Sequence, residues 1–159
     1  MLDGVGKTLS DNMKPLVLFD VDGTLADISR RRHHVMGENK DWGAFFKHMG
    51  DDTPNQPIVN LYKALQASEH YDLVIVSARP DNYRTLTEQW LVWNGIEFER
   101  LIMRPAGDYR PDTEIKKKFL DLLFGEGRKI AFVVDDRDSV VAMWRENGIT
   151  CLQCVPGDF

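Results

Sequence analysis

Two short acidic segments of the sequence have the residue types and spacing for metal-assisted chemistry. The first, "DVDGT", contains Asp20 and Asp22, and the second, "DDRD", begins with Asp135 and Asp136. Residues two apart in an extended strand point to the same side, so we expect the first two carboxylates to lie together. Such carboxylates would repel one another without a cation, and hard oxygen ligands suit Mg²⁺. The pattern therefore predicts a Mg²⁺ site for phosphoryl transfer.

Apolar runs that alternate with helical patterns indicate how the chain positions these groups. "PLVLFD", "YDLVIVS" and "KIAFVVDD" are typical of strands buried on both faces, and "ITCLQCV" predicts a late strand. Between and after them, apolar residues recur at helical spacing. The three apolar runs cover 15–20, 71–77 and 129–136, and the expected helices cover 57–68, 81–95, 112–125 and 139–148.

This alternation predicts one α/β domain over residues 15–159, preceded by a flexible arm over residues 1–14. The expected architecture is Rossmann-like: a mainly parallel sheet with helices on both faces. Ligands of such sheets bind beyond the carboxyl ends of the strands. Ser77 follows the second apolar run, so we expect it at the same rim as Asp20 and Asp135.

The bulk composition restricts the class of protein. The 159 residues are 43% hydrophobic and 28% charged, which is ordinary for a globular domain. The net charge of −5 argues against a protein that coats nucleic acid through bulk electrostatics. The sequence has neither an apolar run that would span a membrane nor an N-terminal signal core. We therefore expect a cytoplasmic protein without a membrane partner.

The segment "GVGKT" at residues 4–8 has the appearance of a phosphate-binding loop. Such a loop needs a further glycine six residues before its lysine, at the exit of a buried strand. Met1 occupies that position. The sequence therefore does not predict an ATP site here.

The only two cysteines, Cys151 and Cys154, form a C-x-x-C. A structural zinc site needs about four ligands, and a redox C-x-x-C usually opens a helix. The pair lies instead in a predicted strand. We expect both thiols to be inert.

Beyond these physical arguments, several motifs resemble those of a known superfamily. "DVDGTLA", Ser77, Lys116 and the "DD" at 135–136 resemble, in order and approximate spacing, the signatures of the haloacid dehalogenase (HAD) superfamily of phosphatases. Further residues restrict the resemblance to one family within this superfamily. They are Arg31, "VSAR", "RPAGDYRPDTEIK", "DDRDSVVAMWR" and the final "PGDF". These motifs are similar to the phosphatase domain of bacteriophage polynucleotide kinase/3′-phosphatase. This resemblance runs from about residue 15 to the end.

The resemblance implies a chemical role for each matched residue. Asp20 would be the nucleophile that forms an aspartyl phosphate. Asp22 would protonate the leaving alkoxide and later take a proton from water. Ser77 would bind a phosphoryl oxygen, and Lys116 would neutralise charge on the phosphoryl group.

The resemblance also implies how Mg²⁺ is bound. Its ligands would be the Asp20 carboxylate, the backbone carbonyl of Asp22, and the carboxylate of Asp135 supported by that of Asp136. Mg²⁺ is the one cofactor that the resemblance implies.

Three further residues match the substrate side of the family's site. Arg31 and Arg79 would contact phosphate, for which a guanidinium is suited to bidentate hydrogen bonding. Asp112 lies one helical turn before Lys116 and would orient it. The alternative for Asp112 is an N-cap of the helix over 112–125.

The segment over residues 27–57 is too short for a large cap domain, so we expect a HAD-like fold with a minimal cap or none. An open site admits a polymer end. The implied function is a Mg²⁺-dependent phosphatase that acts on 3′-phosphorylated DNA or RNA ends.

The alternatives are a phosphatase of free nucleotides or other small phosphomonoesters, and a non-catalytic end-binding partner of a separate kinase. A separate polynucleotide kinase or ligase as partner, and a homo-oligomer, remain open. For a bacteriophage protein the compartment would be the host cytoplasm.

Overall fold

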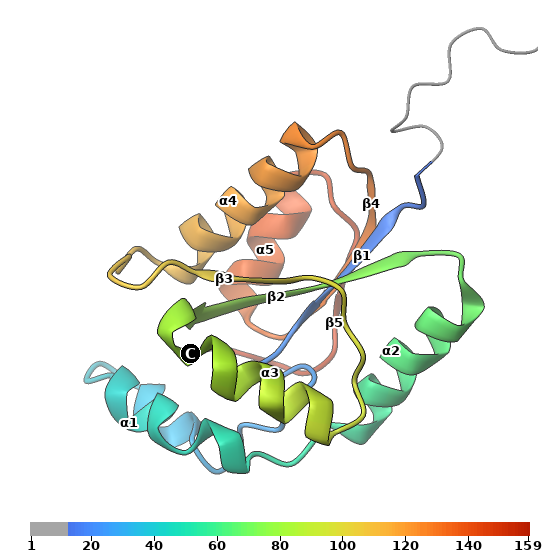
Figure 1. The fold of residues 1–159 in the computed structure, drawn as a ribbon. Coiled ribbons are helices and arrows are strands. Elements are labelled where there is room, and N and C mark those ends of the chain that lie inside the picture. Colours follow the sequence, from blue (N-terminus) through green and yellow to red (C-terminus); the bar gives the residue numbers. More distant parts are fainter. Residues whose placement is uncertain (1–12) are drawn as a thin grey trace, which may run out of the picture.

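A five-stranded, wholly parallel sheet forms the centre of the molecule (Figure 1). The computed structural model describes residues 13–159, so the "GVGKT" segment and most of the expected arm lie outside the described residues. The strand order is β3-β2-β1-β4-β5. The strands are β1 (Leu16–Asp20), β2 (Asp72–Pro80), β3 (Leu101–Arg104), β4 (Ile130–Asp135) and β5 (Cys151–Gln153).

Four helices connect these strands, as the apolar periodicity predicts. They are α2 (Gln56–Ser68), α3 (Arg84–Trp93), α4 (Asp112–Gly125) and α5 (Asp138–Glu146). The prediction for α3 began too early, because a 3₁₀ turn, η4 (Asp81–Tyr83), precedes the helix. Asp81 does not cap this helix, since its carboxylate accepts a hydrogen bond from the Ala106 backbone N–H.

Helices cover both faces of the sheet, which confirms the predicted architecture (Figure 1). The five residues of β1 are buried, and its alternate side chains feed two separate cores. Leu16 and Leu18 pack with residues of α4 and α5, including Trp144. Val17 and Phe19 pack with residues of α2 and α3. Both faces of β1 are therefore packed against helices, which holds its last residue, Asp20, in place at the rim.

Residues 27–57, which we call the lid segment, form a small layer over one end of the sheet. It contains η2 (Arg32–Val35), α1 (Trp42–Lys47) and η3 (Met49–Asp51), and runs into the first turn of α2. Its own core consists of Ile28, Val35 and Phe45, with Phe46 among the half-buried side chains packed against them. This arrangement agrees with the minimal cap expected from the segment's length.

Within residues 13–159, the structure contains no helix of the length and hydropathy required to cross a bilayer.

Candidate active site

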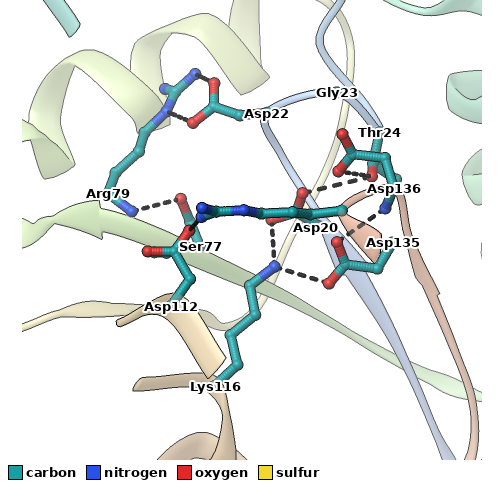
Figure 2. A network of polar contacts seen from close by, with 12 residues as sticks. Asp20, Asp22, Gly23, Thr24, Ser77, Arg79, Asp112, Lys116, Asp135 and Asp136 are labelled. Carbon is teal, nitrogen blue, oxygen red and sulfur yellow. Dashed lines mark hydrogen bonds and ion pairs between the residues drawn. The ribbon is translucent and has the colours of Figure 1, made fainter. Parts of the chain in front are cut away.

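The predicted strand-end residues converge at the carboxyl ends of β1 and β4, where a lysine of α4 joins them (Figure 2). The Lys116 Nζ donates to Asp20 Oδ1 at 2.9 Å and to Asp135 Oδ2 at 2.7 Å. All three side chains are buried. Burial by itself would lower the pKa of Lys116, but the charges of Asp135 and Asp20 raise it well above its usual value. The lysine is therefore a permanent cation beside two carboxylates.

A third carboxylate completes an acidic cluster with room for a cation. One ligand oxygen each from Asp20, Asp135 and Asp136 lies within 4.8 Å of the others. The Thr24 hydroxyl lies 3.4 Å from both Asp20 Oδ2 and Asp136 Oδ1. Burial and the charge of Asp135 raise the pKa of Asp136 to about 7. Three buried carboxylates against one lysine leave excess negative charge, and this all-oxygen donor set fits Mg²⁺.

Gly23 allows this cluster to form next to the chain turn after β1. Its φ is +82°, in the left-handed region that favours glycine. A Cβ atom at this position would lie 2.0 Å from Asp136 Oδ2. The glycine of "DVDGT" therefore makes space for the second aspartate of "DDRD".

The Asp22 carboxylate lies apart from the acidic cluster and is held by two arginines (Figure 2 shows Arg79). Arg79 donates through Nε to Oδ2 at 2.9 Å and through Nη2 to Oδ1 at 2.7 Å, and Arg31 Nη2 donates to Oδ1 at 2.6 Å. The expectation that Asp20 and Asp22 share a side along one strand is wrong, because β1 ends at Asp20. Burial acts to raise the pKa of Asp22, but the two guanidinium groups hold it well below its ordinary value.

Arg31 is placed behind Asp22 rather than at the cavity surface. It is 3% exposed and donates to both carboxylate oxygens of Asp52, at 2.8 and 2.6 Å. It also donates to the Phe45 backbone carbonyl at 2.7 Å. The predicted bidentate phosphate contact is not available in this arrangement, because these partners and Asp22 occupy the guanidinium. Arg79 is equally buried but borders the cavity.

Asp112 lies at the start of α4, but neither predicted local role matches its contacts. The N-cap position belongs to Pro111, so the alternative of an Asp112 cap is wrong. The hydrogen bonds of its carboxylate come from Arg104 Nη2 and Arg137 Nη1, both at 2.5 Å, and not from Lys116. Asp112 thus connects two arginines at the rim of the site.

Ser77 lies within β2, three residues before its end, which corrects the expectation that it closes the strand. Its hydroxyl accepts a hydrogen bond from the Arg79 backbone N–H at 3.2 Å. The pairing register with β3 shifts between Ser77 and Pro80. This irregularity turns the chain so that Arg79 reaches Asp22.

Sequence reasoning missed the partners that hold the site together. Asp52 in the lid segment, Arg104 at the end of β3 and Arg137 in "DDRD" each contact a predicted residue. Asp52 carried no sequence signal, whereas Arg104 opens the quoted motif "RPAGDYRPDTEIK" and Arg137 is the basic residue inside "DDRD". Its Nε also donates to the Phe159 backbone carbonyl at 2.6 Å, which holds the "PGDF" segment against the site.

A cavity of about 660 Å³ opens beside these groups. Asp20, Asp22, Lys116 and Asp136 line it, together with residues of α1 and of the loop between β3 and α4. Figure 1 shows that α1 and this loop lie at the end of the sheet where the strands finish. The position matches the crevice expected for a parallel sheet.

A family model described as the polynucleotide kinase PNKP phosphatase domain matches residues 14–159. The chain belongs to this family. It is therefore a phosphatase of the HAD type, as the sequence resemblance implied.

Individual relatives agree with this assignment. A protein of Autographa californica nuclear polyhedrosis virus, described as a bifunctional polynucleotide kinase/RNA ligase, is 25% identical over 139 residues, which cover 87% of this chain and 19% of that protein. A solved structure of a Pnkp1/Rnl/Hen1 complex contains a chain with 31% identity and a TM-score of 0.76, covering 93% of this chain and 48% of that one. A HAD-like hydrolase from Streptococcus pneumoniae, at 14% identity and a TM-score of 0.60, shows the same fold over 88% of this chain and 84% of its own.

The phosphatase domain spans about half the length of the matched chain in the solved complex and about a fifth of the viral relative.

Proposed function

We propose that this phosphatase removes 3′-phosphate groups from nucleic-acid ends through an aspartyl phosphate on Asp20. The observation that carries the proposal is the position of Asp20. It ends the central strand, hydrogen-bonds to the buried cation Lys116 and lines a cavity much larger than a phosphate group. The family assignment supports phosphatase chemistry, and the names of the relatives supply the polynucleotide context.

In the first step, a carboxylate oxygen of Asp20 would attack phosphorus, and the bond from phosphorus to the 3′-oxygen would break. Burial and the neighbouring carboxylates raise the pKa of Asp20, and Lys116 would oppose that rise and balance charge on the phosphoryl oxygens. The leaving 3′-alkoxide would take a proton from Asp22.

Asp22 can donate a proton only if its arginine contacts weaken. In the described arrangement both guanidinium groups favour its ionised form. A substrate phosphate would compete with Asp22 for Arg79, which borders the cavity. Loss of this contact would raise the pKa of Asp22 and allow it to act as an acid while substrate is bound.

In the second step, water would attack the aspartyl phosphate and release inorganic phosphate from Asp20. Asp22, now ionised, would accept the proton of that water, which restores the starting state. We propose that the Ser77 hydroxyl binds a phosphoryl oxygen in both steps.

The residues present fit a bound Mg²⁺, with carboxylates of Asp20, Asp135 and Asp136 and the backbone carbonyl of Asp22 as its ligands. When bound, Mg²⁺ supplies charge neutralisation that brings the phosphoryl group and the Asp20 carboxylate together.

The names of the relatives support RNA as the nucleic acid. One is described as an RNA ligase fusion, and others are chains of an RNA repair complex. We infer that this phosphatase prepares RNA ends for sealing and works beside a kinase or ligase.

The test is phosphate release, with Mg²⁺ and with EDTA, from 3′-phosphorylated RNA and DNA oligonucleotides, a 5′-phosphorylated oligonucleotide, a 3′-mononucleotide and p-nitrophenyl phosphate. We expect Mg²⁺-dependent preference for the 3′-phosphorylated oligonucleotides, with Asp20→Asn inactive. Preference for the mononucleotide would instead support a phosphatase of small phosphomonoesters. Turnover by Asp20→Asn at the wild-type rate would contradict the proposed nucleophile.

A further inference from the structure

Aromatic side chains line the cavity beyond the catalytic aspartates. The centres of the Trp42 and Phe46 rings are 6.1 Å apart with their planes inclined by 28°, and the centres of the Phe46 and Tyr83 rings are 5.4 Å apart. These half-buried rings come from α1 and η4, and all border the same cavity as Asp20. The chemistry described above uses none of them.

A fourth ring, Tyr109, lies on the loop between β3 and α4 and also borders the cavity. It is 94% exposed. A large aromatic side chain so free of intramolecular packing contributes little to the core. Its position at a cavity edge favours a role in contact with a ligand.

The cavity has room for an occupant larger than phosphate. About 660 Å³ is within the range of pockets that enclose molecules of nucleotide size or larger. Because Asp20 and the rings share one cavity, a molecule whose phosphate meets Asp20 would place its next chemical group beside the rings.

Charge at this wall suits a nucleic-acid strand. The guanidinium of Arg137 lies 5.6 Å from the centre of the Trp42 ring. Arginines interleaved with aromatic rings are the combination by which proteins bind single strands, where the bases stack on the rings. The chain's overall charge is −5, so any such binding has to come from a local surface of this kind.

We propose that Trp42, Phe46, Tyr83 and Tyr109 form a stacking site for the nucleobase of the 3′-terminal nucleotide. The site selects unpaired ends, because a paired terminal base has to leave its duplex before it can stack on the rings. This inference rests on the proposed function and specifies its substrate as a single-stranded 3′-phosphorylated end.

The first experiment varies the substrate and leaves the enzyme intact. It compares kcat/KM of the wild-type chain for two single-stranded oligonucleotides with a 3′-phosphate, one with a normal terminal nucleotide and one whose terminal nucleotide is abasic. We expect the abasic end to be hydrolysed roughly 5- to 100-fold less efficiently, mainly through KM, as for the loss of one stacked base. A blunt duplex with the same 3′-phosphate is expected to be a poorer substrate than the single strand.

The second experiment varies the rings. Tyr109→Ala, at an exposed position, and Phe46→Ala are expected to reduce the preference for the normal end over the abasic end. Trp93→Ala is the matched control, because Trp93 is 72% exposed but does not line the cavity. It is expected to retain the full preference.

Equal hydrolysis of normal and abasic ends by the wild-type chain would overturn the stacking site and leave the 3′-phosphatase function intact. Loss of preference in Trp93→Ala to the same degree as in Tyr109→Ala would also overturn it. Hydrolysis of p-nitrophenyl phosphate without hydrolysis of any oligonucleotide would instead remove the proposed function itself. If Phe46→Ala does not fold, the abasic substrate and Tyr109→Ala still test the stacking site.

Discussion

Arg79 and Asp22 form a bidentate ion pair, with Nε donating to Oδ2 at 2.9 Å and Nη2 donating to Oδ1 at 2.7 Å. The carboxylate is consequently ionised in the described arrangement, although the proposed chemistry needs it first as an acid. This pair makes the acid step dependent on substrate. Arg79 is the residue through which a bound phosphate would change the protonation of Asp22.

The role of Asp22 as an acid predicts a loss that depends on the leaving group. Asp22→Asn is expected to lower kcat for a 3′-phosphorylated oligonucleotide by about 10²- to 10⁴-fold, because the alkoxide then leaves without a proton. The loss on p-nitrophenyl phosphate is expected to be much smaller, since p-nitrophenolate is stable without protonation. Steady-state kinetics on both substrates check this. A loss of the same size on both would show that Asp22 does not act as the acid.

Asp52 is expected to stabilise the fold through its buried pair with Arg31. Asp52→Ala would leave that guanidinium buried and without two of its hydrogen bonds, at a cost of about 3–5 kcal/mol in the free energy of unfolding. Chemical denaturation of the two proteins measures this cost. Asp158→Ala is the matched control, because the Asp158 side chain is 72% exposed and its pair with Arg32 is expected to contribute less than about 1 kcal/mol. Equal costs for the two variants would contradict the prediction.

The space beside Gly23 is expected to be a requirement for metal binding. Gly23→Ala would introduce a Cβ atom 2.0 Å from Asp136 Oδ2 and displace that carboxylate. Gly148→Ala is the control for backbone strain, because Gly148 has a similar φ of +77° with nothing within 4 Å of the added Cβ. We expect both variants to lose roughly 1 kcal/mol of stability from the backbone. Only Gly23→Ala is expected to lose the stabilisation that Mg²⁺ gives in a thermal melt.

The acidic cluster predicts opposite pH dependences for metal-free stability and for metal binding. The pKa of Asp136 in the folded chain is about 7, above its ordinary value of 3.8. Folding therefore favours the protonated form, and this stability is present below about pH 4 and lost as the pH rises through 7. Mg²⁺ needs the ionised carboxylate, so its affinity rises over the same window.

Thermal melts at pH 6 and pH 8, in EDTA and in Mg²⁺, test this pair of trends. The increase in melting temperature on adding Mg²⁺ is expected to be larger at pH 8. An asparagine does not titrate. In Asp136→Asn we therefore expect a smaller difference between the increases in melting temperature at pH 6 and pH 8. An increase that is equal at both pH values in the wild-type chain would refute the assignment.

Part of the candidate active site could be predicted from the sequence, because its residues follow local rules. Apolar runs predict buried strands, and parallel strands bring their carboxyl ends together, so Asp20 and Asp135 were expected at one rim. The place of Lys116 in the site follows from the family resemblance and not from periodicity, and its contacts with Asp20 and Asp135 are a finding of the structure. Its helix, α4, was predicted by spacing alone.

The supporting contacts could not be predicted, because they join segments whose proximity only the tertiary fold decides. Asp52 and Arg31 lie at opposite ends of the lid segment and bind each other, and Asp112 at the start of α4 binds Arg137, the N-cap residue of α5. Helical spacing predicts that Asp112 orients Lys116, one turn away on α4. Its carboxylate instead accepts hydrogen bonds from Arg104 and Arg137. Asp20 and Asp22 would point to the same side only if β1 continued to Asp22. The strand ends at Asp20, and the chain turns immediately after it.

The place of β1 in the sheet has a consequence for the time at which activity can arise. This strand contains Asp20, the proposed nucleophile, and is the first strand of the sheet to be synthesised, yet one of its two neighbours, β4, begins at Ile130. Until that segment emerges, one edge of an apolar strand has no pairing partner and is open to association with other chains. Asp20 is therefore without a completed pocket during most of the synthesis of residues 16–135, and the proposed hydrolysis can begin only once nearly all of this domain has been made.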